Sequence, residues 1–136
     1  MRLFPKSFLK SFLSLLAVFA SARGYTILVL VAAQYLSARY ILATQRSWVE
    51  HLTDYNLFFL VLASSFAIAG GYLINNFYDA EKDRINRPQQ YLLQHLISTE
   101  KQLLYYSFFN GLCMLLAFLV SKKAFLFFFA YISGIW

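Results

Sequence analysis

Residues 56–88 read NLFFLVLASSFAIAGGYLINNFYDAEKDRINRP, an apolar run that passes directly into a short polar segment. The apolar part, Asn56 to about Phe77, is long enough to cross a bilayer core of roughly 30 Å as one helix. Three of the chain's six carboxylates follow it, all within residues 79–83. A membrane-spanning helix that ends in an acidic cluster therefore decides the fold class and locates the candidate site.

The polar segment holds three oxygen-bearing side chains, Asn75, Asp79 and Asp83, spaced four residues apart. On a helix this spacing places side chains on one face. Mg²⁺ takes oxygen ligands, commonly one or two carboxylates together with the phosphate oxygens of a substrate. The alternative is a solvated helix end with i,i+4 ion pairs. The metal site is favoured because polar groups such as Asn75 and Asn76 are costly at a membrane boundary and are candidates for function.

This segment resembles the first aspartate-rich motif of the UbiA superfamily of intramembrane prenyltransferases. That motif has an Asn, an Asp four and again eight residues later, and then commonly Asn-Arg-Pro. Here these are Asn75, Asp79, Asp83 and residues 86–88. The preceding residues 69–74 (AGGYLI) are also similar to the family's approach to the motif.

The chain departs from the family pattern at three points. One is the segment from Gln89 to Ser98, which lacks the Pro and Gly that many members have after Asn-Arg-Pro. Asn76 stands where the family often has Asp. The family also carries a second aspartate motif several helices later, whereas no Asp follows Asp83 in this chain.

The resemblance implies Mg²⁺-dependent transfer of a prenyl group from a polyprenyl diphosphate to a hydrophobic or aromatic acceptor. Acceptors of the geranylgeranylglycerol-phosphate or quinone-precursor type are favoured. By the same resemblance Asp79 and Asp83 would be catalytic, and Asn75, Asp79 and Asp83 would hold the metal. The substrate-binding residues would be Asn75, Asn76, Arg84 and Arg87. Arginine suits this role because a guanidinium group binds phosphate through two N–H donors.

The composition is that of an integral membrane protein. Of 136 residues 60% are hydrophobic and only 13% are charged, against about a quarter charged in soluble domains. The net charge of +6 is typical of Lys and Arg residues that face anionic lipid. No nucleic acid partner is expected, because no basic cluster stands apart from the apolar runs. The single cysteine, Cys113, lies in an apolar stretch and is expected to be a packing residue.

The fold class expected is an all-α transmembrane bundle with about three complete spans. These are Tyr25 to about Ala43, Asn56 to about Phe77, and Leu103 to Val120. Residues 1–23 are expected to form an N-terminal helix, although their basic start and short apolar core also fit a signal peptide. Gln34 lies in the middle of the first span, so it must face other protein or a cavity.

The connections are expected to be polar. Thr44 to Tyr55 is predicted to be a loop, and residues 121–123 a tight turn. Asp79 to Gln102 is predicted to contain a short amphipathic helix over the mouth of the pocket, with Ser98 or Thr99 capping the next helix. The small residues that include Gly70 and Gly71 either let helices approach closely or leave room for a substrate tail.

Residues 124–136 begin a fourth span of thirteen residues, too few to cross a bilayer. The expectation is therefore that residues 1–136 are the N-terminal portion of one longer prenyltransferase domain. One alternative is a non-catalytic remnant or a structural multi-span protein. Another is a transporter fragment in which Gln34 and Asn110 line a path.

The Lys and Arg residues predict the orientation. Eight lie at the N-terminal side or in the 79–102 connection, and four lie on the opposite side. Since cytoplasmic loops are enriched in Lys and Arg, the N-terminus and the acidic motif are expected to face the cytoplasm. A bacterial inner membrane is the expected location.

Overall fold

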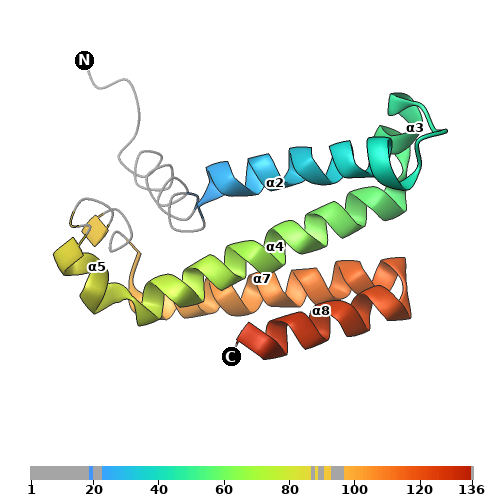
Figure 1. The fold of residues 1–136 in the computed structure, drawn as a ribbon. Coiled ribbons are helices and arrows are strands. Elements are labelled where there is room, and N and C mark those ends of the chain that lie inside the picture. Colours follow the sequence, from blue (N-terminus) through green and yellow to red (C-terminus); the bar gives the residue numbers. More distant parts are fainter. Residues whose placement is uncertain (1–18, 20–22, 87, 89–90, 93–96, 136) are drawn as a thin grey trace, which may run out of the picture.

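The computed structural model describes residues 19, 23–86, 88, 91–92 and 97–135. Every regular element in these residues is a helix, which confirms the all-α membrane class. Figure 1 shows the elements, which are α2 (Gly24–Ser37), η1 (Ala38–Leu42), α3 (Trp48–Thr53), α4 (Tyr55–Tyr78), α5 (Ala80–Asn86), α7 (Thr99–Val120) and α8 (Lys122–Ile135).

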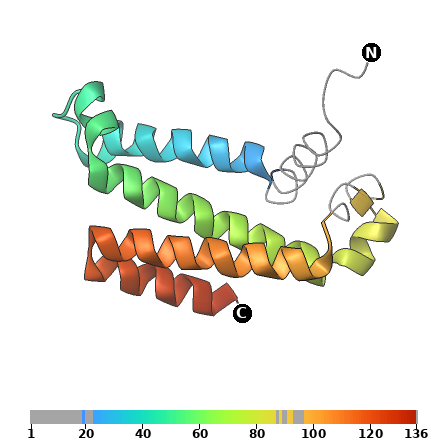
Figure 2. The same cartoon turned by 180° about the vertical axis from the view of Figure 1, so that it is seen from behind.

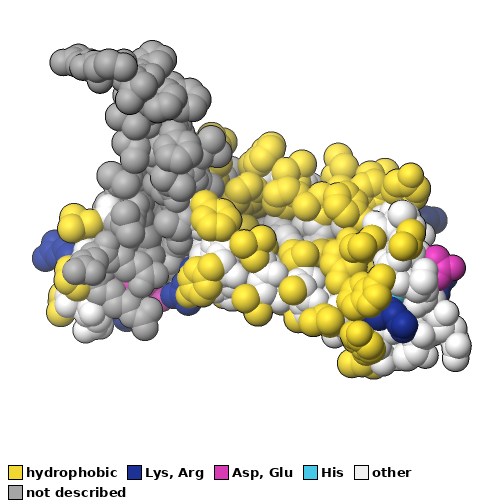
Figure 3. Space-filling view, turned by 90° about the horizontal axis from the view of Figure 1, so that it is seen from above, with side chains coloured by type: hydrophobic (Ala, Val, Ile, Leu, Met, Phe, Trp, Pro, Cys, Tyr) yellow, Lys and Arg dark blue, Asp and Glu magenta, His cyan; other side chains and the backbone are white. Residues whose placement is uncertain are grey.

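Three helices are long and apolar enough to cross a membrane. They are Gly24–Leu42, in which α2 runs on into the π-helix η1, then α4 and then α7. Each covers the predicted span to within a few residues. Figures 1 and 2 show α4 lying beside both α2 and α7, with α8 returning along α7. Hydrophobic side chains cover the middle of the face in Figure 3, and charged side chains gather at its two ends. The molecule is an integral membrane protein.

Small residues allow α4 and α7 to pack closely. Ala63, Ala67, Cys113 and Ala117 are buried together with Phe128 of α8. Further along α4, a Cβ atom added to Gly70 would lie 3.1 Å from Asn110 Oδ1 of α7, a contact tighter than ordinary packing. A glycine at this position avoids that tight contact, in keeping with the small residues found where other membrane helices approach closely.

Two connections differ from the sequence prediction. The predicted loop from Thr44 to Tyr55 contains the helix α3. Its start is fixed by a capping box, in which the Ser47 hydroxyl accepts from the Glu50 amide and the Glu50 carboxylate accepts from the Ser47 amide. This arrangement satisfies two amides that the first turn would leave unpaired.

The predicted turn at residues 121–123 is also shorter than expected. Lys122 and Lys123 already belong to α8, and the Ser121 hydroxyl accepts from the Ala124 amide at 3.1 Å. At the start of α7, Ser98 occupies the capping position as predicted, although its side chain makes no capping bond there. The prediction of an N-terminal helix over residues 1–23 falls almost entirely on residues 1–18 and 20–22, which lie outside the described residues, as does most of the amphipathic helix predicted after Pro88.

Candidate functional site

The acidic motif lies where α4 ends and α5 begins. Asp79 closes α4 with φ −88° and ψ 3°, values that leave the helical region, and α5 starts at the next residue. Two backbone bonds bridge this break: the Asp79 amide donates to the Asn75 carbonyl at 2.9 Å, and the Asp83 amide donates to the Asp79 carbonyl at 2.8 Å. Asn75, Asp79 and Asp83 are therefore still one helical turn apart, as they would be in a continuous helix.

The side chains of Asn75 and Asp79 are in direct contact. Asn75 Nδ2 donates to Asp79 Oδ2 at 3.0 Å. The other carboxylate oxygen of Asp79 accepts from Lys82 Nζ at 3.4 Å, and the Lys82 side chain is 78% exposed. An exposed pair of this kind contributes only about 0–1 kcal/mol. Lys82 can therefore give way to a stronger cation at little cost, while the amide of Asn75 keeps the carboxylate in place.

The other predicted residues are distributed around this pair. Asp83 is half-buried one turn further on, in α5, and Arg84 beside it is exposed. Asn76 is only 4% exposed, because its position on α4 is turned by about 100° from that of Asn75. Arg87 lies outside the described residues. The structure thus brings Asn75 and Asp79 together and turns Asn76 toward the bundle.

The donor set of the motif fits a hard divalent cation held jointly with a ligand. In the described part of the chain no three His, Cys, Asp or Glu side chains are close enough to form a metal cage. Mg²⁺ does not need such a cage, because it usually binds through one or two carboxylates and keeps its remaining positions for water and phosphate. The Asp79 carboxylate, beside the Asn75 amide, can supply the protein ligands of such a site.

The cationic residue directly before α2, Arg23, lies at the same end of the molecule. The Arg23 guanidinium stands over the Tyr72 ring at 5.0 Å from its centroid, and Tyr72 is one helical turn before Asn75 and Asn76. Arg23 also adopts a left-handed backbone conformation, with φ 49°. The contact with Tyr72 depends on how α2 packs on α4, which a linear pattern does not contain.

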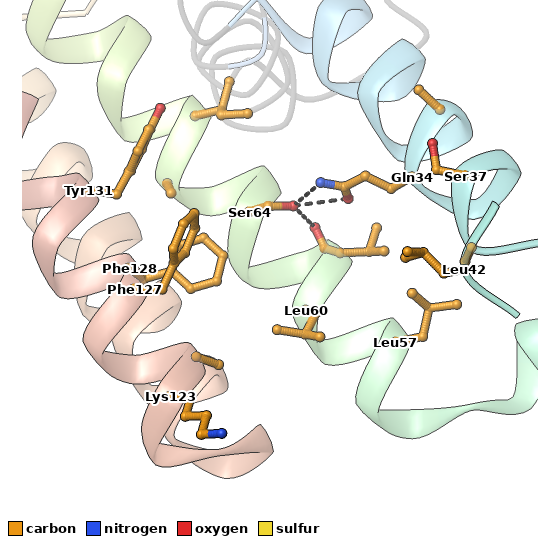
Figure 4. A pocket seen from close by; sticks show the side chains of 16 residues that line it. Gln34, Ser37, Leu42, Leu57, Leu60, Ser64, Lys123, Phe127, Phe128 and Tyr131 are labelled. Carbon is orange, nitrogen blue, oxygen red and sulfur yellow. Dashed lines mark hydrogen bonds between the residues drawn. The ribbon is translucent and has the colours of Figure 1, made fainter.

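A cavity of about 710 Å³ lies between α2, α4 and α8. On its wall Gln34 of α2 and Ser64 of α4 pair: Gln34 Nε2 donates to Ser64 Oγ at 2.8 Å, and Ser64 Oγ lies 3.0 Å from Gln34 Oε1. Figure 4 shows this pair and the mainly apolar side chains around it. The prediction that Gln34 faces protein or a cavity is confirmed, since it does both.

Comparison with known proteins connects this arrangement to a family. The model of the UbiA prenyltransferase family matches residues 31–136. A digeranylgeranylglyceryl phosphate synthase of Thermococcus gammatolerans is 40% identical over 71 residues, which are 52% of this chain and 26% of that protein. The chain thus covers about a quarter of the length of this relative. No solved structure matches the chain.

Proposed function

The chain belongs to the UbiA prenyltransferase family, and on this premise we propose that it transfers a prenyl group from a polyprenyl diphosphate to an acceptor within the membrane. The observation that carries the proposal is the contact between Asn75 and Asp79 at the end of a membrane-spanning helix. It presents a charged oxygen donor where an apolar tail and a charged head group would meet.

The metal ligands are Asn75, Asp79 and Asp83, with Asp79 and Asp83 as the catalytic carboxylates. A Mg²⁺ ion bound there would supply positive charge to the departing diphosphate. Asn75 orients the Asp79 carboxylate through its 3.0 Å bond. Lys82 neutralises that carboxylate before a ligand arrives, and its exposed ammonium group can move away.

The substrate head group is bound by Asn75, Asn76, Arg84 and Arg87. Arg84 is exposed on α5, and its guanidinium can donate two hydrogen bonds to phosphate oxygens. These donors stabilise the negative charge that grows as the C–O bond breaks and its electron pair leaves with the diphosphate. The allylic cation that remains is then attacked by the acceptor, whose displaced proton passes to solvent or to the departing diphosphate.

The acceptor we propose is a lipid of the prenylglycerol-phosphate type, with a quinone precursor as the second candidate. The relative from Thermococcus gammatolerans supports the first choice, because its name describes a synthase of a prenylated glyceryl phosphate. We place the motif on the cytoplasmic side of a bacterial inner membrane, where a water-soluble diphosphate head group is available.

Substitution of Asp79 tests the proposal. Asp79→Asn keeps the shape of the side chain but removes its charge, so Mg²⁺-dependent prenyl transfer by the full-length protein should fall at least about 100-fold. The assay would follow a radiolabelled prenyl diphosphate into an organic-soluble product. Glu81→Gln is the matched control, because Glu81 is an exposed carboxylate of α5 outside the four-residue series. Normal turnover by a folded Asp79→Asn protein would contradict the metal assignment.

A further inference from the structure

The short helix α3 exposes a continuous apolar surface at the end of the molecule opposite the motif (Figure 1). Trp48, Val49 and Leu52 lie within an arc of about 100° on this helix, and these residues are 40%, 70% and 61% exposed. The other side of the helix carries the exposed polar residues Glu50 and Thr53. Exposed apolar side chains that lie together in this way mark a surface that contacts a membrane or another protein.

This surface is continuous with the exposed side of the first span. Tyr40, Ile41 and Leu42 of η1 are exposed, and η1 is the last part of the helix Gly24–Leu42, which is long and apolar enough to cross a membrane. The Trp48 ring meets the Tyr40 ring edge-on, with centroids 5.9 Å apart. The contact between these rings joins the apolar surface of η1 to that of α3.

The length of α4 places α3 at the level of a membrane interface. Tyr55 and Tyr78 are the first and last residues of α4, and both are exposed. They lie about 35 Å apart along the helix axis. This distance slightly exceeds the hydrocarbon core of roughly 30 Å, so both tyrosines reach the interfacial regions, where Tyr and Trp are enriched. The end of α3 is two residues before Tyr55, at the same level.

Contacts with neighbouring elements hold α3 in place. Isolated helices of this length do not form in water, so α3 depends on its capping box and on bonds to the two spans that it connects. His51 is buried, and its Nε2 atom lies 3.2 Å from the carbonyl oxygen of Ala43, the residue after η1. Arg46 Nη1 donates to Asp54 Oδ2 at 2.8 Å, and the Asp54 carboxylate caps α4. The apolar surface of α3 is thus tied to both spans.

The charges of the connection are balanced. Residues 38–55 contain two arginines, Arg39 and Arg46, and two carboxylates, Glu50 and Asp54. An anionic lipid or an acidic protein would therefore find no excess of positive charge here. The partner that fits is one recognised by aromatic and aliphatic groups, which is the boundary between lipid headgroups and acyl chains.

We propose that α3 is an interfacial anchor that binds this lipid boundary on the side of the membrane opposite the motif. Lipid is the partner because the surface continues the exposed side of a membrane span and contains Trp and Tyr. Together with Tyr78, the anchor fixes how deeply α4 lies and so keeps Asp79 at the opposite membrane surface. The inference concerns membrane binding and does not depend on the proposed reaction. The anchor surface is formed by Tyr40, Ile41, Trp48, Val49 and Leu52.

Spin labels test the depth of the anchor surface. Val49→Cys and Leu52→Cys, each in the full-length protein with its other cysteines replaced, would carry a nitroxide in bilayers of neutral phosphatidylcholine. Collisions with oxygen and with a water-soluble nickel complex should place both labels about 5–10 Å within the boundary between headgroups and acyl chains. Gln45→Cys is the control, because Gln45 is an exposed polar residue in the turn before α3. Its label should lie in water.

Two results of this experiment would overturn the proposal. Nickel collisions at Val49 and Leu52 as frequent as those at Gln45 would place α3 in water. Infrequent collisions with both reagents would show that protein covers the surface. Dipolar broadening between labels would then identify a second copy of the chain as the cover, and the lack of broadening would identify another protein segment.

Lipid charge gives a second test of the binding mode. Replacement of part of the phosphatidylcholine by anionic phosphatidylglycerol should leave the depth of both labels unchanged, because the connection carries no excess charge. A depth that is reached only with anionic lipid would contradict recognition by apolar groups.

A matched pair of variants tests whether apolar contact holds α3 at this depth. Leu52→Glu places a charge between Trp48 and Val49 in the apolar arc, and Leu52 is exposed, so the packing of the bundle is not disturbed. The nickel collisions of a label at Val49 should then approach those measured at Gln45. Gln45→Glu adds the same charge outside the arc and should leave the Val49 label at its original depth. An unchanged Val49 depth in the Leu52→Glu protein would refute the proposal.

Discussion

At the scale of single residues, the main feature is the division of the Asp79 carboxylate between an amide and an ammonium group. The bond from Asn75 joins two side chains one turn apart at the end of a membrane helix, whereas the bond from Lys82 comes from an exposed, flexible side chain. Asn75 and Lys82 therefore affect the Asp79 carboxylate in different ways. Asn75 fixes the orientation of a ligand, and Lys82 only compensates its charge.

Asn75→Ala should weaken metal use without removing the carboxylates. Loss of a group that orients a metal ligand typically costs about 10–100-fold in affinity or activity. The Mg²⁺ concentration that gives half-maximal prenyl transfer should therefore rise. Lys82→Ala is the control and should leave this concentration unchanged or lower it, since a competing cation is removed. An unaltered Mg²⁺ dependence in Asn75→Ala would show that Asn75 does not orient the site.

At the scale of helices, Gly70 and Gly111 differ in how closely they approach the neighbouring helix. A Cβ atom at Gly70 would meet Asn110 of α7, whereas a Cβ atom at Gly111 would meet nothing within 4 Å. Both glycines are in the middle of helices, so the change in intrinsic helix preference on replacing glycine by valine is the same for both. The difference between the stability losses of the two variants therefore reports the contact between α4 and α7.

Gly70→Val should destabilise the bundle by about 1–3 kcal/mol, the usual cost of overpacking. Gly111→Val should have a much smaller effect. Thermal unfolding in one detergent, followed by circular dichroism, would measure both variants. Equal shifts in melting temperature would mean that the close approach at Gly70 has no energetic role.

The connection around α3 is expected to respond to acid. Hydrogen bonds with the Ser47 backbone and hydroxyl lower the pKa of Glu50, and hydrogen bonds from the Leu57 and Asn56 amides, with Arg46 nearby, lower the pKa of Asp54. A carboxyl group whose pKa is lower in the folded state stabilises that state above its unfolded pKa. This contribution is lost as the pH falls through the lower, folded value.

Hydrogen exchange of residues 47–57 should therefore accelerate as the pH is lowered below the ordinary range of carboxyl groups, after correction for intrinsic exchange rates. A double variant with Glu50→Gln and Asp54→Asn removes both titrating groups and should show no such acceleration. If the protection of the unmodified protein stays constant over this range, the two carboxylates do not hold the connection together.

At the scale of the whole molecule, the motif and α3 lie at opposite ends of the long helices (Figure 1). The helices between them are covered with exposed hydrophobic side chains. The two ends must therefore face opposite sides of a membrane. The excess of Lys and Arg at the motif end is the reason for our proposal that this end faces the cytoplasm.

Single cysteines introduced on a Cys113→Ala background test this orientation. A membrane-impermeant thiol reagent should label Gln45→Cys in intact cells and Glu81→Cys only after the cells are opened. Both positions are exposed, so the comparison depends on sidedness alone. The reverse pattern would show that the motif faces outward.

The long helices and the motif contact could be predicted from the sequence, and their relative placement could not. Span lengths are set by bilayer thickness, so the apolar run before Asn75 located α4 closely. Likewise the four-residue spacing of Asn75 and Asp79 implied their contact. The helix α3 was missed because six residues are too few to show a periodic hydrophobic pattern. The spacing of Ser47 and Glu50 is, however, that of a capping box, which could have indicated the start of this helix. The cavity was not predictable, because it depends on how three separate helices pack.

The bond between Gln34 and Ser64 also bears on how the protein enters its membrane. Gln34 leaves water only if another polar group replaces that water, because a lone amide in hydrocarbon is costly. Ser64 supplies that group from the next span. The first two spans are therefore expected to leave the insertion machinery for lipid as a pair, and a ribosome-bound chain that ends before Ser64 should still hold its first span beside the translocation channel.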